Sequence, residues 1–214
     1  MKVKQWLNRL NILNKQIDKY CLVCFEKMNK SLFIDSFICD SCLKSMNPEF
    51  KKIKMNDLYG YAIYPYQESV KELLYKFKGC NDIVLKNVFI NQYKLLIEIM
   101  FFNYVIVYVP SSDISNIRRG FNHVVEMFSC LKNQKIDCIE KIDDIKQSSL
   151  DKNKRAEIGN YLRLNEKVSL IKNKNILIVD DVLTTGSTIN ACYKLLKNFT
   201  NKKIKFLVMS YVCR

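Results

Sequence analysis

Short apolar runs alternate with amphipathic segments from residue 59 to the end of the chain. The runs YVIVY, NILIV and IKFLVMSYV carry almost no charge and are rich in β-branched residues, which is typical of strands buried on both faces of a sheet. The segments between them read as helices, the first of which ends at Gly79. This alternation predicts an α/β fold with a mostly parallel sheet, with strands near 59–66, 104–109, 175–179 and 204–212 and helices near 67–79, 83–101, 118–132 and 187–198.

The N-terminal part of the chain has a different pattern. Apolar residues recur there at intervals of three or four, which predicts an amphipathic helix with a stripe of Trp6, Leu10, Leu13 and Ile17. The segment MNPEFKKIKMND (46–57) is polar and contains a proline, so it predicts a linker near residue 50. The chain is therefore expected to divide into a small module of residues 1–50 and an α/β domain of residues 51–214.

Nine cysteines in a chain without a secretory signal favour metal or thiol chemistry over disulfides. Four of them form two CxxC pairs that are separated by 14 residues, and two such pairs complete a tetrahedral zinc site. The alternatives are a redox dithiol or chance spacing. We expect a short hairpin between the pairs, in FEKMNKSLFIDSFI, and mostly buried positions for the other cysteines. The predicted ligands of a structural zinc ion are Cys21, Cys24, Cys39 and Cys42.

The segment NILIVDDVLTTGSTI (175–189) has the composition of a ligand-binding turn. A buried strand delivers Asp180 and Asp181 at its carboxyl end, where ligands bind in open α/β sheets. A Thr/Ser-rich turn with Gly186 then opens a helix, and N–H groups at a helix start attract anions. The alternative is an ordinary strand that ends in a surface turn. Anion binding beside two carboxylates favours a phosphorylated sugar.

The net charge of +14 suits a polyanionic partner, either a nucleic acid or a phosphorylated small molecule. Lysine outnumbers arginine 29 to 6, so codon bias in an AT-rich genome is an equally good explanation of the charge. The few arginines are then the more informative residues, because a guanidinium suits phosphate oxygens. No apolar stretch is long enough to span a membrane, and the N-terminus lacks the features of a signal peptide. These features predict a soluble cytoplasmic protein.

The 175–189 segment resembles the loop of type I phosphoribosyltransferases that binds phosphoribosyl pyrophosphate (PRPP). The resemblance narrows to the ComF family through VPSSDISNIRRGFNHVVEMF (109–128), the paired cysteines, FKG (77–79) and KQSSLDKNKR (146–155). It implies a type I phosphoribosyltransferase-like sheet behind an N-terminal zinc ribbon. It also implies that Asp180 and Asp181 bind the ribose hydroxyls and that the 5′-phosphate lies against Thr184, Thr185, Gly186, Ser187 and Thr188.

The resemblance further implies Mg²⁺ bound with PRPP, a role in DNA uptake, single-stranded DNA as a partner, and helicase-like and recombination-mediator proteins as partners. Candidate contacts to pyrophosphate or nucleic acid are Lys78, Ser111, Arg118, Arg119 and Arg155. The alternative is a phosphoribosyltransferase of nucleotide metabolism with an unknown acceptor and no DNA role.

Three positions depart from the family pattern, namely Tyr108, His123 and Ile158, and none of them lies in the phosphate loop. A threonine at position 184 counts against 6-oxopurine salvage, because salvage enzymes of this fold carry an aspartate there. For His123, the only histidine, a structural role at the start of a helix is favoured over a catalytic one. No catalytic residue is assigned.

Overall fold

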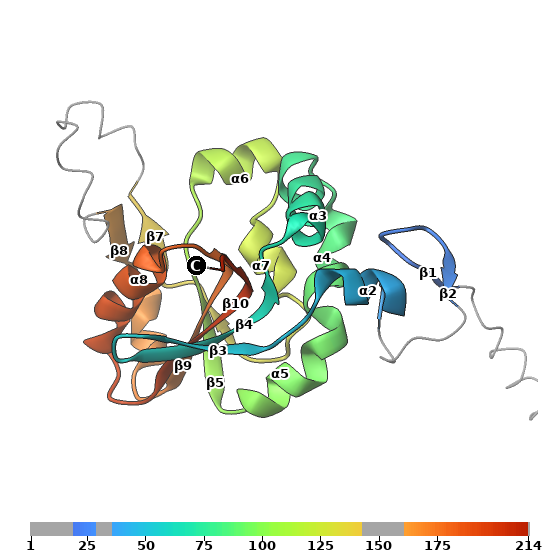
Figure 1. Ribbon diagram of the computed structural model, residues 1–214. Coiled ribbons are helices and arrows are strands. Elements are labelled where there is room, and N and C mark those ends of the chain that lie inside the picture. The colour runs from blue at the N-terminus through green and yellow to red at the C-terminus, as the bar shows by residue number, and fades with distance from the viewer. Residues whose placement is uncertain (1–18, 29–35, 143–160, 214) are drawn as a thin grey trace, which may run out of the picture.

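The protein is described by a computed structural model, which covers residues 19–28, 36–142 and 161–213 (Figure 1). Its centre is a six-stranded sheet with the order β3-β4-β10-β9-β5-β6. All neighbouring strands are parallel except β3, which pairs antiparallel with β4. This arrangement confirms the expected α/β fold. The strands are β3 (Lys51–Met55), β4 (Leu58–Pro65), β5 (Tyr104–Tyr108), β6 (Lys135–Ile136), β9 (Asn175–Leu183) and β10 (Ile204–Tyr211).

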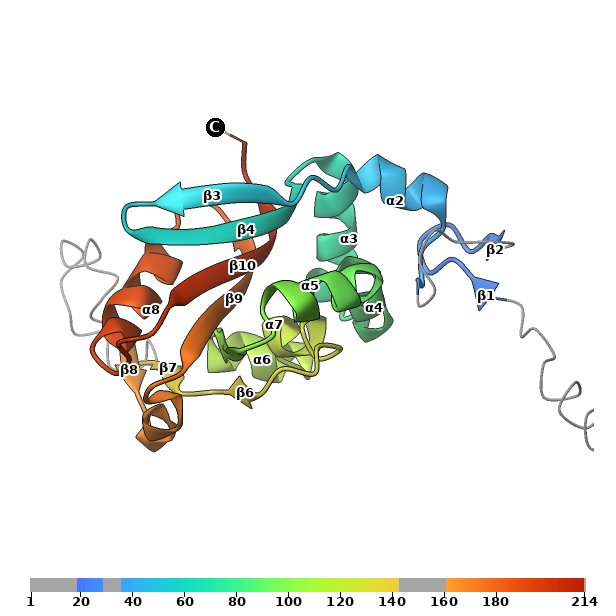
Figure 2. The same cartoon turned by 90° about the horizontal axis from the view of Figure 1, so that it is seen from below.

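Helices cover both faces of the sheet (Figures 1 and 2). One face packs against α3 (Glu68–Gly79), α4 (Lys86–Phe89), α5 (Lys94–Met100) and α7 (His123–Met127). The other face packs against α8 (Ser187–Lys197) and a short antiparallel pair, β7 (Ile139–Lys141) and β8 (Leu162–Leu164). Consecutive strand residues alternate between the two cores, as Leu177 and Ile178 do in β9. The central strands are therefore apolar throughout because both of their faces are buried.

The order of the strands creates a switch point between β5 and β9. From β5 the chain moves outward to β6, whereas from β9 it moves to β10 on the other side. In open α/β sheets the ligand crevice lies at such a point, outside the carboxyl ends of the strands. The loops that leave β5 and β9 are therefore the first place to look for a site.

The segment expected to be a linker near residue 50 is one only in part, because residues 47–50 connect α2 (Asp40–Met46) to the sheet, whereas Lys51–Met55 form the edge strand β3. The segment reads as polar because Lys51, Lys52 and Lys54 are exposed, as is common at the edge of a sheet. Asn56, with φ of 52°, and Asp57 form the two-residue turn into β4. Pro65 ends β4 as expected, although β4 is not an edge strand. The division of the chain into 1–50 and 51–214 stays a prediction.

Two expected helices are broken in the structure. The 83–101 segment consists of η1 (Ile83–Leu85), α4, η2 (Asn91–Tyr93) and α5. The Gln92 side chain donates to the carbonyls of Val88 and Phe89, which a continuous helix would use internally. The 118–132 segment is instead divided between α6 (Asp113–Arg119), which ends at Gly120 with φ of 81°, and α7, which Asn122 caps. Side-chain hydrogen bonds and a left-handed glycine therefore decide these boundaries.

The N-terminal module is small. Strands β1 (Lys19–Tyr20) and β2 (Lys27–Met28) pair antiparallel on either side of the first CxxC. Half of the segment expected to form a hairpin between the two pairs, residues 29–35, lies outside the described residues. Helix α2 (Asp40–Met46) follows the second pair. Ile38, Leu43 and Met46 are buried in the same apolar cluster as α3 and α4. The predicted helix of residues 6–17 lies outside the described residues. The remaining element is η6 (Glu166–Ile171), which precedes β9.

Candidate functional site

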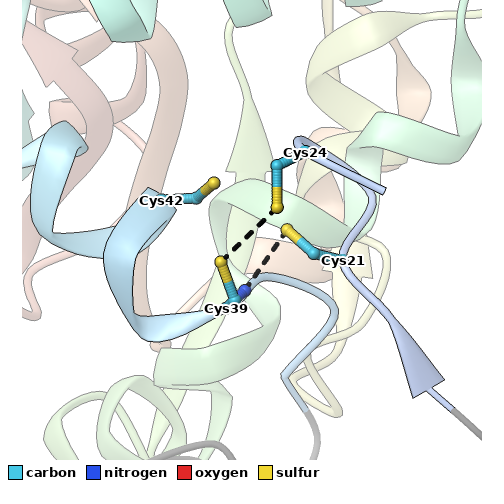
Figure 3. A group of neighbouring side chains, drawn as sticks. All are labelled: Cys21, Cys24, Cys39 and Cys42. Atoms are coloured by element: carbon cyan, nitrogen blue, oxygen red, sulfur yellow. Dashed lines mark hydrogen bonds between the residues drawn. The ribbon is translucent and has the colours of Figure 1, made fainter. Parts of the chain in front are cut away.

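The four paired cysteines come together at one point between the β1–β2 hairpin and α2 (Figure 3). Their sulfur atoms all lie within 4.8 Å of one another, and the Sγ atoms of Cys24 and Cys39 are 3.7 Å apart. Tetrahedral zinc with Zn–S bonds of about 2.3 Å requires S···S distances of about 3.8 Å. The donor set therefore fits a metal ion such as zinc.

Hydrogen bonds and burial give the cysteines of the cluster different environments. The backbone N–H groups of Val23 and Cys39 donate to Cys21 Sγ over 3.4 and 3.3 Å. Burial opposes ionisation of Cys39, but the Ser41 hydroxyl and the Cys42 backbone outweigh it and lower the pKa of the Cys39 thiol to about 6. Burial raises the pKa of Cys42 far above its usual value. Because a cation lowers the pKa of a neighbouring thiol, a bound metal would remove this difference.

Strand β9 carries the acid pair at its carboxyl end. The predicted strand stopped near Val179, but pairing with β10 continues to Leu183. The two carboxylates therefore belong to the strand itself and point to opposite faces of the sheet. Asp181 faces α7, where it meets His123, whereas Asp180 lies close enough to Cys192 of α8 to affect that thiol. Each acid thus has a separate environment.

Three polar side chains form a network around Asp181. Its Oδ2 atom forms an ion pair with the Lys78 ammonium at the end of α3 and lies 3.0 Å from His123 Nε2. Arg119 at the end of α6 holds the other side of the ring, with Nη1 3.1 Å from His123 Nδ1. The Nε atom of Arg119 also donates to the Lys78 carbonyl over 3.1 Å. Three helices therefore converge on one carboxylate.

The network decides which groups carry charge. A guanidinium can only donate, so His123 Nδ1 accepts and the ring proton is on Nε2, beside Asp181. Burial lowers the pKa of His123 below its ordinary value despite Asp181. Burial opposes ionisation of Asp181, but His123 and Lys78 hold its pKa well below the usual range. Burial and the Asp181 charge raise the pKa of Asp180. Asp181 is thus the ionised member of the pair.

The predicted phosphate loop connects β9 to α8. Gly186 has φ of 76° and directly precedes the first residue of α8. The Thr185 and Ser187 hydroxyls are 2.8 Å apart, and the Ser187 N–H donates to Thr185 Oγ1 over 3.3 Å. Thr184 and Thr185 are exposed, whereas Ser187 and Thr188 are half-buried. Hydroxyls and backbone N–H groups therefore gather at the start of an 11-residue helix, which suits an anion.

The other predicted contacts are distributed unequally. Lys78 and Arg119 belong to the Asp181 network. Ser111 follows β5, donates to Asn116 over 2.8 Å and lines a 390 Å³ cavity at the carboxyl edge of the sheet. Arg118 is exposed on α6 and has no hydrogen bond or ion pair with the described residues. Arg155 lies outside the described residues.

Sequence analysis missed the position of His123. The ring is 8% exposed at the start of α7, as a structural histidine would be, but it also contacts the acid of the candidate site. The only available signal was a single histidine directly after RRGFN. That spacing does not show which carboxylate the ring meets.

A sequence model of the phosphoribosyl transferase domain matches residues 118–211 of this chain. The competence protein ComFC of Streptococcus pneumoniae (strain ATCC BAA-255 / R6) is 31% identical over 151 residues, which are 67% of this chain and 64% of that protein. The chain thus spans slightly less than two thirds of the length of this relative.

Two solved structures have a distant likeness to the chain. One is phosphoribosylpyrophosphate synthetase from Mycobacterium smegmatis, at 18% identity and a TM-score of 0.32 over 54% of this chain and 33% of that one. The other is a hypoxanthine-guanine phosphoribosyltransferase from Bacillus anthracis, at 18% identity and a TM-score of 0.34 over 73% of both chains. These scores are too low to carry an argument.

The domain match covers the second half of the chain, including β9 and its loop, and the identity to ComFC extends over a longer stretch. Among the described residues, no helix is long and apolar enough to cross a membrane. A phosphoribosyl transferase domain behind a four-cysteine module, in a chain 31% identical to ComFC, makes this protein a member of the ComF family of phosphoribosyltransferase-like proteins.

Proposed function

We propose that PRPP binds at the carboxyl end of β9. The observation that carries the proposal is that one strand delivers Asp180 and Asp181 immediately before a glycine-initiated helix, at the switch point of the sheet. The acids accept hydrogen bonds from the ribose hydroxyls, and the 184–188 loop donates to the 5′-phosphate. Mg²⁺ bound with PRPP screens the charge of its pyrophosphate.

The ion pair with Lys78 gives the site a ligand-dependent charge arrangement. Without ligand, the negative charge of Asp181 is balanced by the Lys78 ammonium. When a ribose hydroxyl replaces the ammonium at Asp181, Lys78 becomes available to the pyrophosphate. Arg119 holds the histidine ring and the Lys78 backbone in place during this exchange. These residues bind and orient PRPP, and we assign none of them to a bond-breaking step.

Isothermal titration calorimetry with PRPP and Mg²⁺ tests this proposal. Removing both acids, in the Asp180→Ala, Asp181→Ala variant, eliminates the charge-assisted acceptor Asp181, worth about 1.5–3 kcal/mol, together with the neighbouring acceptor Asp180, so we expect a loss of at least tenfold in affinity. The control is Asp57→Asn, which removes an exposed acid at the opposite end of β4. Equal affinity in the double variant and the wild type would contradict the assignment.

Transfer of the phosphoribosyl group to an acceptor is a second candidate activity, which the domain match favours. This is the role of an enzyme of nucleotide metabolism without a DNA partner. A screen of nucleobase and amine acceptors for pyrophosphate release tests it. Pyrophosphate release that requires an acceptor would support the transferase, and its absence with every acceptor would leave a PRPP-binding protein.

We also propose that the cysteine cluster holds structural zinc. A small module depends on such a metal to fold, because it has little apolar core of its own. Elemental analysis of protein purified without chelators should give one zinc per chain. A value near zero would contradict the proposal.

The relative's name, competence protein, and the net charge of +14 support a role in DNA uptake. We propose that the protein binds incoming single-stranded DNA in the cytoplasm and passes it to helicase-like and recombination-mediator partners. Arg119 is committed to His123 and the Lys78 carbonyl, so Arg118 is the freer of the two predicted arginine contacts. Anisotropy of a labelled oligonucleotide, titrated with salt, tests binding, which should weaken steeply as counterions compete.

A further inference from the structure

Two neighbouring hollows lie at the amino ends of the parallel strands, at the opposite end of the sheet from the PRPP site. One, of 780 Å³, lies over the starts of β5 and β9, and the other, of 520 Å³, lies over the starts of β4 and β10. Lys202, in the turn before β10, lines both of them. Because they share Lys202, we treat the two hollows as one surface across the amino ends of four parallel strands and call it the amino-edge groove.

Lysines dominate the charge of this groove. Only two acids, Asp57 and Glu98, line it, and Glu98 already accepts a hydrogen bond from the Lys132 backbone over 2.7 Å. None of the lining lysines forms an ion pair with an acid in the described part of the chain. They come from four separate segments of the sequence and are Lys132, Lys174, Lys197, Lys202, Lys203 and Lys205.

The charge is unevenly distributed between the two edges of the sheet. The 390 Å³ cavity at the carboxyl edge is lined by three acids and only two basic residues. Codon bias towards lysine would raise the charge everywhere and does not explain this contrast. The amino-edge groove therefore holds more lysines without an acidic partner among the described residues than this cavity does.

Aromatic rings accompany these lysines. Phe102 is 80% exposed and Tyr59 is 41% exposed, although burial of such rings is normally favoured. Among the lining residues, the Lys205 ammonium lies 5.5 Å from the Tyr104 ring centre and the Lys197 ammonium lies 5.9 Å from the Tyr193 ring centre. Exposed rings beside unpaired cations are the elements of a single-strand surface, because bases stack on the rings while phosphates meet the cations.

Amide side chains complete the lining of the groove. Asn103, in the hollow beside Phe102, and Asn201, in the other hollow, make no side-chain hydrogen bond with the described residues, whereas Asn133 and Asn175 are held by backbone groups. Amides can both donate and accept, so they suit the edges of unpaired bases. A duplex would hide those edges and faces, and a small anion would need no exposed rings. The combination favours a single-stranded polynucleotide over both.

We propose that the amino-edge groove is the surface that binds single-stranded DNA, on the side of the sheet opposite the PRPP site. This inference rests on the single-strand binding proposed above and assigns its location. It moves the main contact away from Arg118 and Arg119, which lie on α6. One chain can then hold a DNA strand and PRPP at the same time.

The test uses the full-length protein and a labelled oligothymidylate, with anisotropy measured over a range of salt concentrations. Lys202→Gln with Lys203→Gln should weaken binding and reduce the salt slope by about 1.4, since each phosphate contact to a single strand contributes about 0.7. Phe102→Ala should weaken binding about tenfold without changing that slope, because stacking is not ionic. Both results together would support a groove that uses charge and stacking.

The controls remove the same groups elsewhere. Lys44→Gln with Lys141→Gln eliminates two exposed charges on α2 and β7, and Tyr75→Ala eliminates a ring that is 69% exposed on α3. Equal losses in the groove and control variants would overturn the proposed location and leave diffuse charge. Duplex DNA bound as tightly as the single strand would also overturn it.

The outcomes for the wild type separate this inference from the proposal on which it rests. Tight single-strand binding that no groove variant weakens would contradict the location alone. No binding at low salt would contradict both the groove and the DNA role. Calorimetric binding of PRPP, measured on the same samples, reports on the other edge and shows that each variant is folded.

Discussion

The ion pair between Lys78 and Asp181 should be measurable as a coupling between the two side chains. Asp181 is 10% exposed and Lys78 is 30% exposed, so the pair is mostly removed from water. A charge-assisted interaction of this kind contributes about 1.5–3 kcal/mol. Lys78→Met and Asp181→Asn should each lower the free energy of unfolding by about 2 kcal/mol. The double variant should lose little more than either single variant, because neither partner is then left alone.

Urea unfolding at neutral pH provides the measurement. With a slope of about 2 kcal/mol per molar, each single variant should shift the midpoint by roughly 1 M. The comparison pair is Lys86 and Glu126, at 2.5 Å, whose acid is 27% exposed, so its coupling should be smaller. Losses at Lys78 and Asp181 that add within about 0.3 kcal/mol would refute the pairing. Because the pair lowers the pKa of Asp181, its contribution is complete above about pH 4 and declines as the acid is protonated below it.

Three further predictions concern other parts of the protein. The pKa of His123 is lowered in the folded chain, so the unfolded chain binds a proton first as the pH falls below about 6.5. The stability of the wild type should therefore decline below that pH, and that of His123→Gln should decline less, as measured by urea midpoints. Cys24→Ser should remove zinc and speed amide hydrogen exchange over 36–46 while PRPP affinity is unchanged; loss of both would show that the module supports the PRPP site. Gly186→Ala should destabilise the protein more than Gly120→Ala in thermal unfolding. Both glycines have positive φ, which costs an alanine about 1–2 kcal/mol, but of the two only Gly186 would bring the new Cβ against Met55 Sδ. Equal losses of stability would mean that Met55 moves freely.

The sequence by itself determined the class of fold and indicated the residues of two candidate sites. The apolar runs of β5, β9 and β10 are readable because strands covered on both faces need apolar residues at every position. The CxxC spacing is readable because both thiolates of each pair must reach one ion. The acid pair and its turn are readable because a strand followed at once by a glycine and a helix leaves few other geometries.

The local hydrophobic pattern did not predict secondary structure correctly where interactions outside that pattern determine the path of the backbone. Strand β3 looks like a linker because an edge strand needs only one apolar face, and its pairing with β4 is visible only in the sheet. Gln92 divides an apolar segment into short helices through its own hydrogen bonds to carbonyls. In both cases the deciding interaction is absent from the hydrophobic periodicity.

Only the tertiary structure decided which charges meet. Lys78, Arg119, His123 and Asp181 come from four elements, and their convergence makes Asp181 the ionised acid and leaves His123 neutral. In the sequence the lysines look evenly spread, yet folding brings six of them to the amino ends of four strands. The physical reason is the same for both. The strength of an electrostatic interaction depends on distance and burial, which residue order does not specify.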